Sequence, residues 1–440
     1  ALLIGIMSCV GLIALKRPFH KIMTGTLKPI LGYLMLAAGA GVIVSNLDPL
    51  GKMIEHGFHI TGVVPNNEAI VAVAQKVLGV ETMSILVVGL LMNLLIARFT
   101  KFKYVFLTGH HSLFMACLMS AVLGTAGLSG IELILVGGFL MGAWSAISPA
   151  IGQSYTSKVT DGDEIALGHF GSLGYYLSAW VAKYVGKAEE STEDIEIPEK
   201  WGFLRDSTLS TALTMIVFYL IAAIAAGSEF VATLSGSMSP YLFAVMSAMN
   251  FAVGVAIVYS GVRMILGDLI PAFQGIATKI IPNAIPAVDC AVFFTYAPTA
   301  VVLGFISSFI GGIIGMLILG AVGGVLIIPG LVPHFFCGAT AGIYGNATGG
   351  RRGAAVGAFL NGLAITFLPA LALPVLGQLG FQNTTFGDAD FAVMGLVLGN
   401  AFEWIGMAGI YGVVVIAALV LIIPNFIKTK GKVINYVEEE

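Results

Sequence analysis

Long apolar runs separated by short polar segments make up most of the chain. A membrane-spanning helix needs about 20 predominantly apolar residues. Ten runs approach or exceed that length, and one of them is long enough for a helix pair with a turn. We therefore predict an all-α polytopic membrane protein with about eleven transmembrane helices. The ten runs are Ala1–Leu15, Leu27–Asn46, Met83–Ala97, Tyr104–Leu128, Ile131–Ile151, Leu209–Ser228, Tyr241–Val262, Ala297–Val332 (the pair), Gly353–Leu376 and Phe402–Phe426.

Basic residues between these runs gather in clusters, which mark cytoplasmic loops of membrane proteins. The stretches near Gly124–Gly130 and Gly377–Ala401 carry no lysine or arginine, so we expect them on the outside. The C-terminus is then expected in the cytoplasm. The clusters are Lys16, Arg17, Lys21 and Lys28; Arg98, Lys101 and Lys103; and Lys428, Lys430 and Lys432.

One substantial hydrophilic region, Gln153–Ser207, holds 10 of the 24 acidic residues. It divides the chain into a first membrane repeat (residues 1–152), a central hydrophilic or re-entrant region (153–208), and a second repeat with a C-terminal span (209–440). Within the centre, Ile165–Val181 is free of charge except for His169. A re-entrant hairpin, an interfacial helix and a further span all fit this segment.

Internal repetition and glycine placement both favour a transport function. Ile30-Leu31-Gly32, Leu34 and Ala37 recur 235 positions later as Ile265-Leu266-Gly267, Leu269 and Ala272. Many transporters consist of two repeats with the substrate bound between them. Gly320–Gly330 and Gly338–Gly353 also interrupt apolar runs beside prolines. Non-helical backbone at membrane depth is tolerated where it lies inside protein or lines a water-filled cavity, so these breaks favour a lined pathway.

Composition strengthens the membrane assignment and narrows the function. Only 10% of the 440 residues are charged, against about 25% in soluble domains, and the mean hydropathy is +0.96. The net charge of −3 is too small to attract nucleic acid. No nucleotide-binding P-loop or hydrolase elbow is present, so energy for transport comes from an ion gradient or a separate protein. The four single cysteines indicate small buried side chains.

Two carboxylates lie beside short, proline-bounded apolar segments in opposite halves, and ionisable groups in apolar segments are functional candidates. Asp289 stands between Pro286 and Pro298, where we expect a short half-helix. Glu68 follows Pro65 and Asn67 in a comparable place. A carboxylate there accepts hydrogen bonds from a polyol, or acts as a base toward a hydroxyl. Helix capping explains the same residues.

Histidines supply further candidate ligands, because a neutral imidazole both donates and accepts hydrogen bonds. We favour site roles for His110, at the head of an apolar run, and for His169 in the central region. His20, His56 and His59 lie in polar segments and are expected at the surface. The histidine spacing matches no zinc motif, so we expect neither metal nor cofactor on this chain.

Several of these segments, taken together, resemble the ascorbate-type enzyme IIC of the bacterial phosphoenolpyruvate-dependent sugar phosphotransferase system. The resemblance covers nearly the whole chain. The resembling stretches are Phe106-Leu107-Thr108-Gly109-His110, Val159-Thr160-Asp161-Gly162, Leu167-Gly168-His169, Ala287-Val288-Asp289-Cys290-Ala291, Ala297-Pro298-Thr299-Ala300-Val301-Val302 and Ile327-Ile328-Pro329-Gly330.

This resemblance implies a homodimeric inner-membrane permease with a core domain, a V-shaped dimerisation domain, re-entrant hairpins and two inverted repeats. Its sugar would be phosphorylated by a separate IIB protein supplied by IIA, with no catalysis by this chain alone. The resemblance places the substrate at His110, His169, Asp289, Asn67 and Glu68. The acidic stretch Glu189–Glu199 and the basic loops are candidate docking surfaces for IIB.

The chain also departs from the pattern associated with ascorbate. Phe114 and Phe170 follow the two histidines where glutamine-rich polar residues are expected, and Glu68 replaces a tyrosine. The substrate is therefore L-ascorbate or a related sugar or sugar acid. Two other functions remain open from the residues: an ion-coupled transporter that binds a proton or sodium at Glu68 and Asp289, and a membrane enzyme or receptor.

Overall fold

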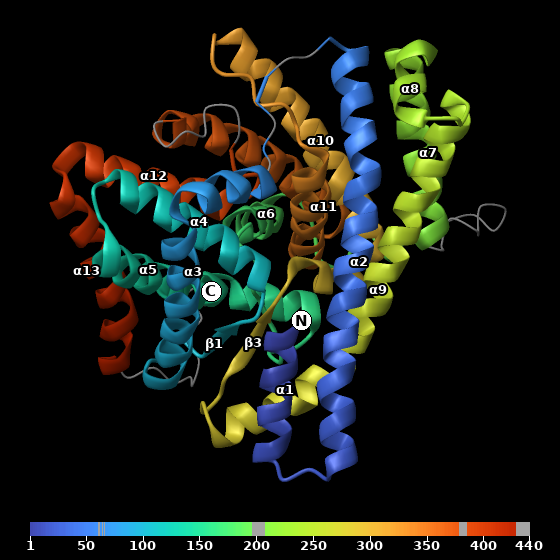
Figure 1. Ribbon diagram of the computed structural model, residues 1–440. Helices are drawn as coiled ribbons and strands as arrows, with labels where there is room; N and C mark the ends of the chain where they lie inside the picture. Colours follow the sequence, from blue (N-terminus) through green and yellow to red (C-terminus); the bar gives the residue numbers. More distant parts are fainter. Residues whose placement is uncertain (60–61, 64, 66, 196–206, 378–384, 428–440) are drawn as a thin grey trace.

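The computed structural model describes residues 1–59, 62–63, 65, 67–195, 207–377 and 385–427. Most of the described chain is helical, and short strands occur between the helices along the sequence (Figure 1). In chain order they are α1 (Leu2–Ala14), α2 (Phe19–Gly57), α3 (Asn67–Phe99), β1 (Tyr104–Phe106), α4 (Gly109–Thr125), α5 (Gly130–Thr160), β2 (Ala166–Leu167), α6 (Ser172–Val185), α7 (Ser207–Ala226), α8 (Ser228–Ser235), α9 (Pro240–Lys279), β3 (Ile285–Val288), the 3₁₀ helix η2 (Cys290–Thr295), α10 (Pro298–Ala321), α11 (Leu331–Gly377), α12 (Ala389–Ile405), α13 (Met407–Ile422) and the 3₁₀ helix η3 (Ile423–Phe426).

Seven helices in the described ranges are long and apolar enough to cross a membrane, and the bent pair α7–α8 raises the number to eight. The chain is therefore a multi-pass helical membrane protein. The predicted number of about eleven spans is not confirmed. The prediction that one run, Ala297–Val332, forms a pair of helices is wrong. This run contains α10, a glycine-rich connection and only the first two residues of α11. The seven are in α2, α3, α5, α9, α10, α11 and α13.

The segment Ile165–Val181 was left open by its sequence, and in the structure it contains β2, a turn and most of α6. Helix α6 has 14 residues, which is too few for a helical span of about 20. It ends beside the broken middle of α11, where Gly349 and Gly350 have non-helical backbone angles. That break lies within the predicted interruption Gly338–Gly353.

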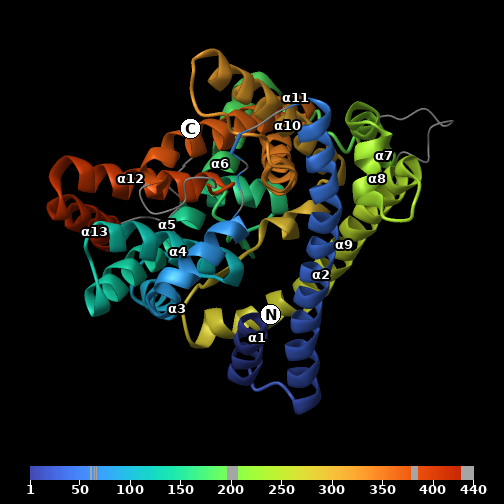
Figure 2. The same cartoon turned by 45° about the horizontal axis from the view of Figure 1, so that its top comes forward.

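The helices form two groups (Figures 1 and 2). In one, α2 packs along α9, and α1 and α7 pack against this pair. In the other, α3 packs with α4 and α5, while α10, α11 and α6 pack together and α12 joins both sets. Each group contains elements from both halves of the sequence. The proposed boundaries at residues 152 and 208, and the two inverted repeats, stay predictions.

A three-stranded parallel sheet, which the sequence did not predict, connects distant parts of the second group. Strand β3 is central, with Phe106 of β1 opposite Ala287 and Leu167 of β2 opposite Val288. The pairing continues past the strands, where the Gly168 amide donates to the Val288 carbonyl at 2.7 Å. A side chain at Gly168 would lie 2.4 Å from the Ala287 carbonyl oxygen, so this approach requires glycine.

Candidate functional site

The carboxyl ends of the three strands lie at one edge of the sheet because the strands are parallel. Asp289 directly follows β3, and His169 comes two residues after β2. His110 and His111 begin α4, just beyond the end of β1. Three turns from separate parts of the sequence therefore bring one carboxylate and three imidazoles together.

A cavity of about 620 Å³ lies between these turns and helix α2. On the α2 side, its lining runs from Tyr33 to Glu55, which corresponds to about 33 Å of helix. Four of the five predicted site residues line it: Asn67, His110, His169 and Asp289. Glu68 belongs to the first turn of α3, but its side chain lies outside the described part of the structure.

Asp289 has the capping role that was one of the two alternatives for it, and it also lines the cavity. It caps η2, because its Oδ1 accepts a hydrogen bond from the Ala291 amide at 3.2 Å. Its Oδ2 lies 3.3 Å from Nε2 of His110, whose Nδ1 is 3.3 Å from the Tyr33 hydroxyl. Asp289 is only 8% exposed. A chain of three polar groups thus runs from α2 to the carboxylate at the end of β3.

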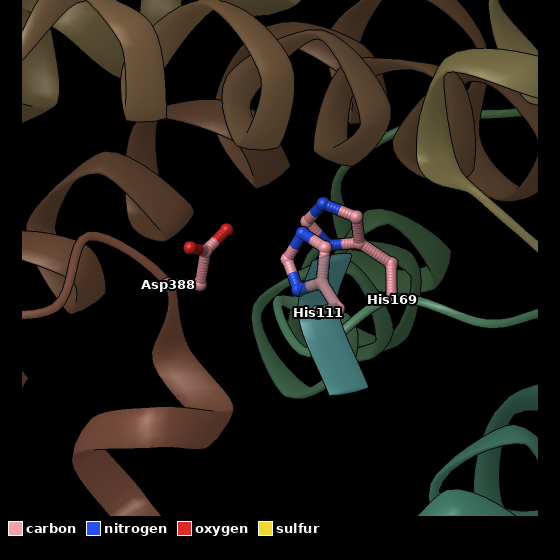
Figure 3. Close-up of side chains that lie close together, drawn as sticks. All are labelled: His111, His169 and Asp388. Carbon is pink, nitrogen blue, oxygen red and sulfur yellow. The ribbon is translucent and has the colours of Figure 1, made fainter. Parts of the chain in front are cut away.

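His111 and His169 form a second polar cluster, together with Asp388. Figure 3 shows the two imidazole rings side by side, with the Asp388 carboxylate across from them, and the ring centroids are 3.7 Å apart. All three residues are buried and line the cavity. Sequence reasoning missed His111 and Asp388. Only the fold brings Asp388, just before α12, beside the strand turns.

Backbone amides determine which nitrogen of each buried imidazole carries its proton. The Phe170 amide donates to Nδ1 of His111 at 3.3 Å, and the Gly171 amide donates to Nδ1 of His169 at 3.1 Å. A neutral imidazole whose Nδ1 accepts must carry its proton on Nε2. Neither Nε2 makes a hydrogen bond within the described ranges. Both rings therefore offer free N–H donors.

The positions of these histidines and carboxylates also bear on metal binding. Two groups have the proximity that a metal requires: His111, His169 and Asp388, and His169, Asp289 and Cys290. A metal needs the lone pair of an imidazole nitrogen, usually with the other nitrogen donating to an oxygen. Here each Nδ1 accepts from an amide instead, so the arrangement suits hydrogen bonding to a solute better than metal ligation.

Two side chains, Asn67 and Cys337, donate hydrogen bonds to Asp388. Its Oδ2 accepts from the Asn67 side-chain amide at 2.6 Å, and its Oδ1 accepts from the Cys337 thiol at 2.8 Å. The side-chain oxygen of Asn67 in turn accepts from the Gly387 amide at 2.9 Å. Asn67, predicted from the resemblance, thus fixes a carboxylate that the prediction did not include. Cys337 is buried, as expected, but also donates a hydrogen bond.

Asp390 lies outside the cavity lining but anchors the turn that carries His169. It is fully buried, with Oδ1 accepting from the Leu173 amide at 2.9 Å. Its Oδ2 accepts from Ser172 at 2.7 Å and from the indole of Trp144 at 3.1 Å. The Asp390 amide also donates to the Phe170 carbonyl. The β2–α6 turn is therefore tied to the start of α12.

The arrangement is that of a membrane permease: spanning helices enclose a cavity lined by hydrogen-bonding groups at broken backbone segments. The family model described as the sugar-specific permease component of the phosphotransferase system matches residues 1–390, and the chain belongs to this family. A curated relative from Mycoplasma pneumoniae, described as an ascorbate-specific phosphotransferase system EIIC component, is 26% identical over 408 residues. The match covers 79% of this chain and 61% of the relative.

Proposed function

We propose that this chain is the permease component of a phosphotransferase system in the bacterial cytoplasmic membrane. It moves L-ascorbate or a related sugar or sugar acid, which a IIB protein, charged by IIA, phosphorylates. Family membership supports the transport class, and the relative's description makes ascorbate the first compound to test. The cavity beside Asp289 and the three histidines carries the proposal, because it offers a polyhydroxy solute several donors and acceptors.

In this proposal the Asp289 carboxylate accepts a hydrogen bond from the solute hydroxyl that is to be phosphorylated. Its Oδ2 is available to a solute hydroxyl when the contact with Nε2 of His110 gives way, while Oδ1 remains with the Ala291 amide. A carboxylate accepting a hydroxyl proton makes that oxygen a better nucleophile toward a phosphoryl donor. Tyr33 orients His110 from the other side of the cavity.

The IIB docking surface stays a prediction, and the acidic stretch contributes less to it than its charge suggests. Glu193 accepts hydrogen bonds from the Thr299 and Ala300 amides and so caps α10. Glu190 lies 4.0 Å from Arg351. These two acids have structural partners, whereas Glu196 and Glu199 fall outside the described residues.

The experiment is solute uptake into proteoliposomes or cells that contain this chain with its IIA and IIB proteins. Uptake is expected to require phosphoenolpyruvate and IIB and to deliver phosphorylated solute. Matched vesicles without IIB, and vesicles treated with an ionophore, serve as controls. Ionophore-sensitive uptake that continues without IIB would favour ion-coupled transport and refute the proposal. A non-transported product would indicate a membrane enzyme.

A further inference from the structure

We infer that Asp388 and His111 form a second solute-binding position, which holds a different hydroxyl of the solute from the one at Asp289. This inference rests on the proposed transport function and assigns a binding role to Asp388. His169 is close to both positions. One of its nitrogens lies within 4.8 Å of a His111 nitrogen and an Asp388 oxygen. A nitrogen of His169 also lies within 4.8 Å of an oxygen of Asp289.

The spacing between Asp388 and the two imidazoles fits a bridging hydroxyl. Figure 3 shows the three side chains together, and in the described part of the chain Asp388 makes no hydrogen bond to either ring. A hydroxyl oxygen lies about 2.7–2.9 Å from each group to which it is hydrogen-bonded. One oxygen can therefore join a carboxylate and an imidazole N–H that are about 5 Å apart. The separation of 4.8 Å or less is within that reach.

The two sides of this position offer complementary hydrogen-bonding groups. Each oxygen of Asp388 accepts one hydrogen bond, from Asn67 or from Cys337, and has the capacity to accept another. Nε2 of His111 and Nε2 of His169 carry protons without partners within the described ranges. A solute hydroxyl donates to the carboxylate and accepts from an imidazole at once. All three side chains are buried, so little water is available to replace a missing solute hydroxyl.

Hydrogen bonds on both sides of Asp388 hold it in place before the solute binds. The Gly387 amide donates to the side-chain oxygen of Asn67 at 2.9 Å. The Asp390 amide donates to the carbonyl of Phe170, in the β2–α6 turn, at 2.9 Å. A group that is already fixed loses little freedom when the solute binds, so its hydrogen bond contributes more fully to affinity.

The test is a thermodynamic cycle, measured as solute binding to the purified full chain in nanodiscs without phosphoenolpyruvate or IIB. The probes are L-ascorbate, D-xylose and D-gluconate, each with analogues that lack a single hydroxyl. For a probe that binds, loss of one particular hydroxyl is expected to weaken binding at least tenfold, about 1.4 kcal/mol. Asp388→Asn should also weaken binding of the intact probe at least tenfold. It should weaken binding of that analogue less than threefold, because the partner of the hydroxyl is already lost.

The substitutions are chosen to keep the surrounding hydrogen bonds. In Asp388→Asn the remaining oxygen accepts from Asn67, and the new amide lies beside the Cys337 sulfur, a weak acceptor. In His111→Asn the side-chain oxygen takes the place of Nδ1 and accepts from the Phe170 amide, whereas the Nε2 donor is absent. His111→Asn should therefore weaken binding through the same hydroxyl as Asp388→Asn.

Two other variants provide the comparison. Asp289→Asn should weaken binding through a different hydroxyl, and Glu229→Gln, an exposed acid on α8 outside the cavity lining, should leave every affinity unchanged. Coupling of Asp388 and Asp289 to the same hydroxyl, equal losses for the intact probe and every analogue, or no binding of any probe to the parent protein overturns the inference. Ionophore-sensitive uptake without IIB refutes only the proposed function, because the binding cycle omits the energy source.

Discussion

Substituting Asp390 by asparagine tests whether the buried carboxylate organises the His169 turn. The new asparagine side chain loses least when its amide oxygen takes the place of Oδ2 and keeps accepting hydrogen bonds from Ser172 and Trp144. The amide nitrogen then faces the Leu173 N–H, a donor against a donor. An unsatisfied buried donor costs about 1–3 kcal/mol, and losing the charge weakens the remaining two bonds by about 1 kcal/mol each.

Part of that loss is offset, because a neutral amide is easier to bury than a carboxylate. We therefore expect Asp390→Asn to lower the free energy of unfolding by about 1–3 kcal/mol. The assay is chemical unfolding in detergent micelles, followed by tryptophan fluorescence. Solute binding should weaken as well, because the turn that holds His169 loses an anchor.

Asp268→Asn provides the control for this measurement. Asp268 pairs with Lys28 at 3.6 Å, but both side chains are partly exposed. Such a pair contributes about 0–1 kcal/mol. Most surface substitutions change the free energy of unfolding by no more than about 0.5 kcal/mol. If the free energy of unfolding of Asp390→Asn lies within that range of the parent protein's, the role assigned to Asp390 is wrong.

Three further substitutions address other parts of the site and its frame. Asp289→Asn is expected to abolish uptake while the protein stays folded, and near-normal uptake would reject its assignment. Cys337→Ala removes a hydrogen-bond donor to Asp388, worth about 1 kcal/mol, and should therefore weaken solute binding about fivefold. Cys337→Ser keeps a donor and should retain binding. Equal effects of the two substitutions would contradict the role assigned to the thiol. Gly304→Ala places a methyl group 2.4 Å from a backbone oxygen of α11. This substitution should lower the free energy of unfolding by about 1–3 kcal/mol, measured by thermal unfolding in detergent. Gly412→Ala, which has open space, is the control; similar unfolding of the two variants would refute the close-packing explanation.

Much of the frame was predictable because membrane helices leave a strong compositional signal. The apolar runs identified most of the long helices, and proline and glycine marked η2 and the break in α11. The same signal overestimated the number of spans. A run such as Ala297–Val332 is uniformly apolar, and hydropathy does not distinguish a helix from an apolar connection that is covered by protein.

The site was only partly predictable, for two physical reasons. Strands of two to four residues are too short to show the alternation that reveals a half-buried strand, so the sheet that assembles the turns left no pattern. His111 follows His110 directly, and neighbouring helical positions point in different directions, so the sequence did not indicate that both line the cavity. Asp388 has no local signal, because its partners Asn67 and Cys337 are far away in sequence.

The parallel sheet determines where the proposed solute-binding residues lie, but it does not determine which residues they are. Backbone hydrogen bonds between β1, β3 and β2 hold the three turns, while the side chains that meet the cavity stand beyond the strand ends. A change of chemistry at Phe114 or His169 therefore leaves the strand pairing intact. Such a scaffold allows selectivity to diverge among related permeases, or to be redesigned, by exchanging a few side chains on an unchanged support.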